Sequence, residues 1–273
     1  MKKMLLLVPF VVLILGCEGQ IVQKFEPEPD IFALMKIDND SPNVSYSQRI
    51  RVDRSWDIKD TVNVWGVRDA LVRIIPGNSS YVFVDSFFDP DSNYWRKYTE
   101  GHYYALLHPK LNDTTLYKLE VSLPWGDTVT GETKMPSQIS LSWPKDEDTL
   151  SIANELANPH LITWNNCLNV GLYTLQCVPN VDTSMYDSFP PFLFIPSFTI
   201  DTSYAFFQER AAIPWVYNRE YVIRINAYGT EYANYVKFGL SGGKANLATQ
   251  DGDTCYGVFS GIAIDSVRVF ITP

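Results

Sequence analysis

Apolar and polar residues alternate along most of this chain with a period of two. In the segment Thr115–Leu123, every second residue from Tyr117 onward is apolar, and the residues between them are polar. Tyr221–Ala227 and Asp265–Ile271 show the same alternation. Successive side chains of a strand point to opposite faces of a sheet, so this pattern predicts strands with one buried face.

Shorter runs rich in β-branched and aromatic residues predict further strands. They are Arg49–Arg51, Thr61–Val67, Ala70–Ile75, Tyr81–Phe87, Tyr103–Leu107, Thr149–Ile152, Leu161–Trp164, Gly171–Val178 and Ala205–Glu209. Turn residues separate the strands, as in Pro76-Gly77-Asn78 and Trp125-Gly126-Asp127. No long segment has a helical period, and Lys244–Gln250 has room for one short turn of helix at most. Many short strands separated by turns predict an all-β fold.

The strands fall into two blocks. The run Thr128–Ser137 closes the first block with Met135-Pro136, and a second set of strands begins at Ile139. We therefore expect two tandem antiparallel β-sandwiches of the immunoglobulin-like kind, at residues 31–137 and 138–273. Both lengths are normal for sandwich domains.

The N-terminus has the features of a targeting signal. Lys2 and Lys3 precede the apolar stretch Leu5–Leu15, which is too short to span a bilayer comfortably. The stretch ends in Ile14-Leu15-Gly16-Cys17, which resembles the bacterial lipobox. This implies a signal peptide at residues 1–16, cleavage before Cys17, and acylation of that cysteine. An ordinary signal peptide with a chance cysteine, or a short signal anchor, is the alternative.

Residues 17–30 would then form the lipidated cysteine and an acidic stalk, which Pro27 and Pro29 stiffen. Residue 18 is Glu rather than the Asp that resembles an inner-membrane retention signal, so we expect the outer membrane. Whether the protein would face the periplasm or the cell surface stays open.

The charge of the chain excludes one class of partner. The formal net charge is −9. Removing the two signal lysines leaves 20 Lys+Arg against 31 Asp+Glu, a net charge of −11. Nucleic acid is therefore not an expected partner, since phosphate binding needs a basic face. We expect the body to be repelled by anionic lipid and to contact the membrane only through its lipid anchor.

Three cysteines follow Cys17 in the chain, so at most one disulfide can form among them. Cys167 and Cys177 lie about 20 Å apart along the predicted strand, too far for a disulfide. Cys177 and Cys255 are a candidate pair in an oxidising compartment, and buried free thiols are the alternative. No C-x-x-C motif supports a zinc knuckle or a redox pair.

Parts of both blocks resemble known sandwich modules. Leu161–Trp164, Gly171–Leu175 and Tyr221–Gly229 resemble strands of a fibronectin type III module. Val67–Ile75 and Tyr117–Met135 resemble a transthyretin-like or carboxypeptidase-regulatory-like sandwich.

The whole chain is similar to a family of outer-membrane lipoproteins of uncharacterised function. Their members end with a Gly-x-Phe segment before the last strand, here Gly257–Gly261. Members are often encoded beside TonB-dependent receptors. The resemblance therefore implies a role as accessory to nutrient uptake. The cysteines of the second block and its aromatic insertion depart from the family pattern.

No residue constellation predicts catalysis or a cofactor. The three histidines, His102, His108 and His160, form no metal-ligand motif, and no nucleophile elbow or phosphate loop is present. Among the acidic pairs Asp38/Asp40, Asp89/Asp91 and Asp251/Asp253, the last is the best candidate for calcium. Solvated turns are the favoured interpretation of all three. We expect a protein that is not an enzyme and has no cofactor or metal.

Two aromatic groups are candidate contact surfaces. The segment Tyr186–Phe198 holds four phenylalanines, which are Phe189, Phe192, Phe194 and Phe198. It contains three prolines as well, so it is an edge or a loop rather than a central strand. It either contacts a partner protein or folds over the sandwich and buries its rings. The other group, a candidate sugar-stacking platform, consists of Tyr94, Trp95, Tyr103 and Tyr104.

We therefore expect a lipid-anchored, non-enzymatic protein of the cell envelope that acts by binding. Its expected role is as an accessory or partner of an outer-membrane nutrient receptor, in line with the family resemblance. One alternative is a carbohydrate- or peptide-binding surface module. The other is a hydrolase whose site is assembled from carboxylates without a recognisable motif.

Overall fold

The computed structural model describes residues 28–38, 47–55, 66–85, 101–106, 111–179, 197–205, 218–238 and 245–273. Most of these residues lie in strands, so the all-β prediction is confirmed. The strands are β1 (Pro29–Asp38), β2 (Ser47–Arg54), β3 (Leu71–Pro76), β4 (Tyr81–Asp85), β5 (His102–Leu106), β6 (Leu116–Ser122), β7 (Thr128–Lys134), β8 (Leu141–Trp143), β9 (Asp148–Ser151), β10 (Ile162–Trp164), β11 (Val170–Pro179), β12 (Ser197–Thr199), β13 (Ser203–Tyr204), β14 (Arg219–Gly229), β15 (Leu247–Thr249) and β16 (Tyr256–Thr272). The described helices are α3 (Ile152–Ala157) and α5 (Thr230–Phe238).

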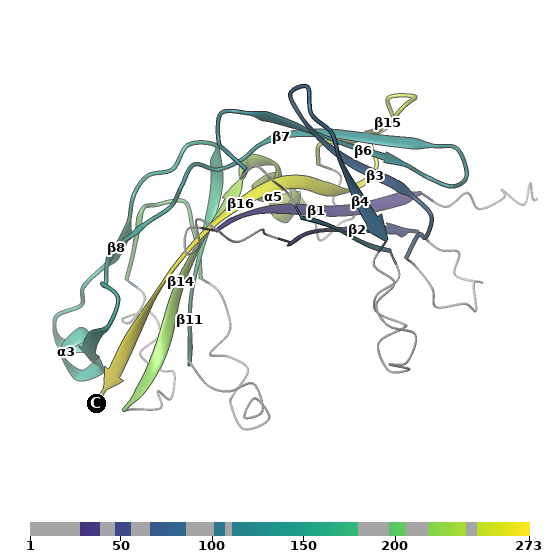
Figure 1. Cartoon of the computed structure of the whole chain (residues 1–273). Helices are drawn as coiled ribbons and strands as arrows, with labels where there is room; N and C mark the ends of the chain where they lie inside the picture. The colour runs from purple at the N-terminus through teal and green to yellow at the C-terminus, as the bar shows by residue number, and fades with distance from the viewer. Residues whose placement is uncertain are drawn as a thin grey trace, which may run out of the picture.

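One long, curled sheet runs through the molecule (Figure 1). Its strand order is β12-β11-β14-β16-β1-β2-β5-β4-β3-β6-β7-β15, with β9 beside the end of β16, and β13-β10-β8 form a smaller sheet. Figure 1 shows β3, β6 and β7 lying over β1, β2 and the first part of β16. The apolar side chains between these layers form the core, and each fully buried Ile or Met contributes about 1.5–3 kcal/mol relative to exposure.

Strand β16 pairs with strands from both halves of the chain. Its first part pairs in parallel with β1, from Asp30 opposite Tyr256 to Asp38 opposite Ile264. Its second part pairs antiparallel with β14, from Tyr228 opposite Ile262 to Arg219 opposite Ile271. The sheet is therefore continuous across the predicted boundary near residue 137.

The segment Gly257–Gly261, which the family resemblance puts before the last strand, lies inside β16. Gly257 has φ +100°, and a Cβ there would lie 1.9 Å from the carbonyl oxygen of Ile31 on β1. A Cβ at Gly261 would lie 2.5 Å from Cδ of Pro136. The two glycines therefore let β16 approach β1 on one side and the Met135-Pro136 segment on the other.

The Met135-Pro136 segment, which the sequence suggests as a linker, packs inside the molecule. Met135 is fully buried, and its carbonyl oxygen accepts a hydrogen bond from the side-chain amide of Asn169 at 3.0 Å. At the other predicted boundary, Pro29 and Asp30 of the expected stalk are the first residues of β1.

The sequence pattern missed both described helices. In α3, Ser151 is the N-cap, and its hydroxyl accepts from the N–H of Asn154. The carboxylate of Glu155 is almost fully buried and lies 3.0 Å from Nδ1 of His160. Within Lys244–Gln250, where the sequence allows one short turn of helix at most, Leu247–Thr249 form the strand β15.

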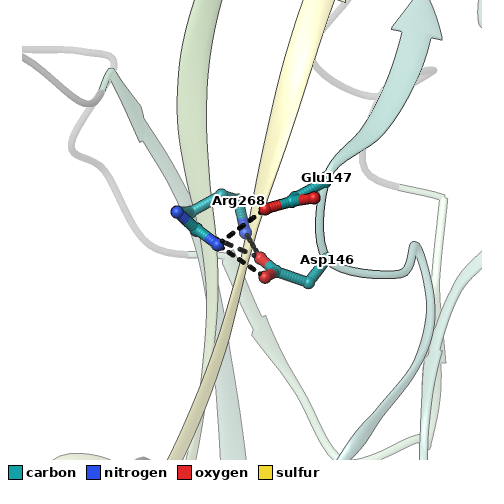
Figure 2. Close-up of polar contacts among 3 residues, drawn as sticks. All are labelled: Asp146, Glu147 and Arg268. Carbon is teal, nitrogen blue, oxygen red and sulfur yellow. Dashed lines mark hydrogen bonds and ion pairs between the residues drawn. The ribbon is translucent and has the colours of Figure 1, made fainter.

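An ion pair fastens the turn before β9 to the far end of β16 (Figure 2). The guanidinium of Arg268 donates to the carboxylate of Asp146 at 2.8 Å and contacts Glu147 at 3.2 Å. The main-chain N–H of Arg268 also donates to Asp146 at 2.8 Å. These hydrogen bonds hold the pKa of Asp146 below its ordinary value. The side chains are exposed, so the contact positions the turn but adds little stability.

Candidate binding surface

Helix α5 is fixed on the outer face of the large sheet by small residues and one carboxylate. A Cβ at Gly171 on β11 would lie 2.7 Å from Cβ of Ala233, so only glycine admits the helix this close. The carboxylate of Glu231 accepts a hydrogen bond from the hydroxyl of Thr133 at 3.0 Å and lies 3.4 Å from that of Ser260. Glu231 in the first turn also suits the helix dipole.

Four aromatic rings meet where α5 crosses the sheet, and we call Phe32, Tyr228, Tyr232 and Tyr235 the aromatic cluster. Tyr228 at the end of β14 stacks on Tyr232 with ring centroids 4.4 Å apart. Phe32 on β1 makes edge contacts with Tyr232 at 6.3 Å and with Tyr235 at 6.0 Å. All four side chains are half-buried. Strand β1 and the consecutive elements β14 and α5, which are distant from it in sequence, thus form one partly exposed apolar surface.

A row of polar residues runs from this surface across β1 and β2 to the buried His102 on β5, and we call Asp30, Asp53, Arg51 and His102 the polar row. Asp30 lies opposite Asp53, and Arg51 lies opposite His102, in the register of the three strands. Nη2 of Arg51 is 2.6 Å from Oδ2 of Asp53. Asp30 lies two residues before Phe32 on β1, so the same face of the strand presents both side chains.

Burial changes the pKa values within the polar row. It raises the pKa of Asp30, the charge of Asp53 raises it further, and Arg51 lowers it. Burial also raises the pKa of Asp53, and the guanidinium of Arg51 opposes this effect. Burial and the charges of Arg49 and Arg51 lower the pKa of His102, which is therefore neutral at pH 7.

The aromatic cluster and the polar row have complementary chemistry. The rings offer apolar contact and π faces, and Arg51 and the two carboxylates offer charged hydrogen-bonding groups at the border. Burial raises the pKa of Tyr232 and Tyr235, so their hydroxyls stay protonated at pH 7. Tyr and Arg are enriched where proteins contact each other, so this combination suits non-covalent recognition.

A second surface feature is less suited to a ligand. A groove of about 470 Å³ lies over β6 and β7 and is lined in part by Lys118, Glu132 and Asn246. Nζ of Lys118 is 2.8 Å from Glu132, and the amide of Asn246 donates to the carbonyl oxygens of Glu132 and Phe259. These three side chains are thus already paired within the protein.

The residues that the sequence suggested for partner binding lie mostly outside the described part of the chain. This applies to Cys17 and to Phe189, Phe192 and Phe194. The backbone of Phe198 lies in β12, at the edge of the sheet, opposite Thr174 of β11.

One residue of the suggested sugar-stacking platform, Tyr103, is buried and is not available for stacking on a sugar. Tyr103 is 1% exposed, and its hydroxyl donates to the carbonyl oxygen of Val67 at 2.8 Å and accepts from the N–H of Ala70. It is a core residue whose polar tip is bonded to the main chain. Tyr94, Trp95 and the side chain of Tyr104 lie outside the described residues.

The structure does not bring the candidate disulfide partners together. Cys177 lies opposite Ile223 on β14, which lies opposite Val267 on β16. Cys255 precedes β16, so twelve residues, on the order of 40 Å of extended strand, separate it from that position. Both residues are buried thiols. Cys167 is a buried thiol as well, and its N–H donates to the hydroxyl of Tyr173.

The other candidate residues do not form a metal site. Among the residues that the structure describes, no group of three or more His, Cys, Asp or Glu could hold a metal ion. Asp251 and Asp253 lie exposed in the turn between β15 and β16. His102 joins the polar row, His160 contacts Glu155, and His108 lies outside the described ranges.

Sequence reasoning missed the aromatic cluster, although one signal was present. Tyr228, Tyr232 and Tyr235 have the spacing i, i+4, i+7, which on a continuous helix would put three rings on one face, although α5 begins only after Tyr228. The segment has no aliphatic stripe beside them, so it did not stand out as a helix. Phe32 could not have been joined to them from sequence, because β1 meets α5 only in the folded sheet.

Neither described helix is long and apolar enough to cross a membrane. Comparison of the chain with family models finds no match, and comparisons with curated proteins and with solved structures find none either.

Proposed function

We propose that this chain is a lipid-anchored, non-enzymatic protein of the cell envelope that binds a partner protein through the aromatic cluster and the polar row. The observation that carries the proposal is the meeting of four half-buried rings with Asp30 and Arg51 on one outer face. A contiguous group of partly exposed rings rimmed by polar residues is the kind of surface that marks an interaction site.

The sequence supports a cellular location for this activity. The signal features and the lipobox at Ile14–Cys17 support anchoring at the outer membrane. The resemblance to lipoproteins encoded beside TonB-dependent receptors favours a nutrient receptor as the partner. In this proposal the two halves of the chain are two immunoglobulin-like sandwiches, the second fibronectin-like, and β16 fuses them into one body.

A carbohydrate or peptide ligand is the second candidate. Aromatic rings beside carboxylates and an arginine are the groups that also bind sugars, through stacking and hydrogen bonds. The protein partner is favoured because these residues spread over α5 and three strands, an extent that suits a broad surface.

Cross-linking in intact cells tests the proposal. A C-terminal tag would recover the protein with its cross-linked neighbours, which mass spectrometry would identify. The informative variant is Tyr232→Ser with Tyr235→Ser. The matched control is Val82→Ser with Val84→Ser on β4, where both side chains are exposed. We expect the wild type and the control to recover one stoichiometric outer-membrane receptor. The tyrosine variant should recover at least tenfold less of that receptor. Equal recovery from all three proteins would contradict the proposal. Recovery of the lipoprotein alone would favour a glycan or peptide ligand.

A further inference from the structure

Three rings of the aromatic cluster form a nearly regular triangle. The centroid distances are 6.3 Å for Phe32–Tyr232, 6.0 Å for Phe32–Tyr235 and 6.2 Å for Tyr232–Tyr235. Tyr232 and Tyr235 are within 28° of parallel, while Phe32 is inclined to them by 76° and 63°. A group above the centre of this triangle would lie within roughly 6 Å of each ring centroid, the distance at which a cation over a ring face is attracted to it.

Asp30 places a carboxylate at the border of this triangle. It lies two residues before Phe32 on the same face of β1. No ion pair among the described residues includes Asp30, because Arg51 is engaged by Asp53 at 2.6 Å. Asp30 is thus a half-buried carboxylate that makes no ion pair among the described residues. The charge of Arg51, which lies opposite Phe32, acts on it less strongly than burial and Asp53 do.

The local charge balance also favours a cation. Asp30, Asp53 and Arg51 together carry one net negative charge when ionised. Arg49 lies four residues from Asp53 along β2, about 13 Å of extended strand, and does not neutralise Asp30 directly. A positively charged group arriving at the triangle would therefore meet aromatic rings and the carboxylate of Asp30, whose charge Arg51 offsets only in part.

We propose that Phe32, Tyr232, Tyr235 and Asp30 form a subsite for a basic side chain, lysine or arginine, of the partner protein. This inference rests on the proposed function, because it names the chemistry that the same surface recognises. The rings contact the ammonium or guanidinium group through cation–π attraction, and Asp30 supplies the opposite charge. Binding is non-covalent and needs no co-reactant.

The free protein is not stabilised by the charged form of Asp30, and this agrees with a binding role. Burial and the charge of Asp53 raise its pKa, so the folded protein disfavours the carboxylate form. A group with a raised pKa favours folding most at low pH, and that advantage is lost as the pH rises through the folded pKa. At pH 7, Asp30→Asn should therefore leave stability unchanged or raise it. A loss of binding in this variant could not be explained by misfolding.

The probes for the test are Nα-acetyl-arginine amide and Nα-acetyl-lysine amide, with Nα-acetyl-norleucine amide as the uncharged control. The mature chain with its anchor is held in an uncharged detergent, and its tyrosines carry a fluorine label. Fluorine NMR then follows Tyr232 and Tyr235, whose signals are assigned with Tyr→Phe variants. We expect saturable shifts with both cationic probes, of millimolar affinity, and none with norleucine.

Substitutions test which side chains contribute to probe binding at the subsite. Asp30→Asn and Tyr235→Leu should each weaken probe binding about two- to tenfold, as expected for one charge or one ring. Asp251→Asn removes an exposed carboxylate elsewhere and should change nothing. Equal shifts with norleucine, no shifts with any probe, or equal weakening by Asp251→Asn would each overturn the subsite.

The two proposals fail in different ways. If cross-linking traps the receptor through the tyrosines while the cationic probes do not bind, the partner role stands and the basic side chain is wrong. If the probes bind at Tyr232 and Tyr235 but no partner is captured, the subsite stands and the proposed receptor role is wrong.

Discussion

The two halves of β16 are held in place by different means. The first half is buried on both faces: Val258, Phe259, Ser260 and Ala263 are fully buried, and two glycines allow neighbouring backbone to come close. The second half alternates, with Val269 and Ile271 fully buried and Arg268 and Phe270 exposed. The first half thus depends on close backbone fit, and the second on the burial of every other side chain.

This difference shows why one strand can join two parts of a sheet. The parallel neighbour β1 on one edge and the contact with α5 leave most side chains of the first half buried, and this half carries no charged residue. The second half has a water-facing side, where Arg268 reaches the turn at Asp146 (Figure 2). Substitutions in the first half should therefore act through backbone clashes, and those in the second half through lost burial.

Gly257→Ala should have the largest effect. The added Cβ would lie 1.9 Å from the carbonyl oxygen of Ile31, and φ +100° strains any side chain. Strain and overpacking together predict a loss of about 3–5 kcal/mol in the free energy of unfolding, measured by urea titration. Gly252→Ala is the matched control, because φ is +86° there but nothing lies within 4 Å. It should cost about 1–2 kcal/mol, and equal losses would show that close approach is not the cause.

Ile271→Ala should have the next largest effect, because its side chain is fully buried in the second half of β16. A truncation of this kind costs about 2–4 kcal/mol. Phe270→Ala, one residue earlier on the exposed face, should change stability by only about 0.5 kcal/mol. Thermal and urea unfolding would measure both. A larger effect at Phe270 would contradict the alternation that we assign to this half.

Gly261→Ala should have a smaller effect than Gly257→Ala. Its added Cβ would meet Cδ of Pro136 at 2.5 Å and Sδ of Met135 at 2.8 Å, and the methionine side chain can move. Overpacking of this kind costs about 1–3 kcal/mol in unfolding experiments. Met135→Ala in the same chain should recover part of the loss caused by Gly261→Ala. Full additivity of the two substitutions would argue against a direct contact.

Arg268→Gln should have the smallest effect on stability, because its ion pair is exposed. Its effect should be seen in titration instead. In the wild type the pKa of Asp146 lies below 3.8 because Arg268 donates to its carboxylate. A depressed pKa gives stability that is present above pH 3.8 and is lost as the pH falls through the folded pKa. NMR titration of Asp146 should show its pKa rising toward the ordinary value in the variant; an unchanged pKa would contradict the contact.

The sequence was informative wherever one face of a strand meets water. Alternation identified β6, β14 and the second half of β16, and the turn at Gly126 has the positive φ that its sequence suggests. It could not identify β1 or the first half of β16 as partners, because both faces of the latter are buried and more than 200 residues separate the two strands. Burial on both faces removes the period-two signal.

The candidate site was harder to predict than the fold. Tyr103 and Tyr235 are both tyrosines in aromatic-rich segments, yet one is a core residue bonded to the main chain and the other lies half-exposed beside Phe32. Only the folded sheet decides which ring is covered. The proximity of Asp30 to the triangle of rings likewise depends on the position of α5 on the sheet. Gly171 and Glu231 set that position through tertiary contacts.

Site-specific photo-cross-linking tests the central claim most directly. A benzophenone amino acid would replace Tyr235 in the aromatic cluster or, as the control, Val84, which is 68% exposed on β4. After irradiation of intact cells, we predict one cross-linked outer-membrane protein from position 235 and at most a tenth of that yield from position 84. Equal yields from the two positions, or adducts only from position 84, would contradict binding through the aromatic cluster.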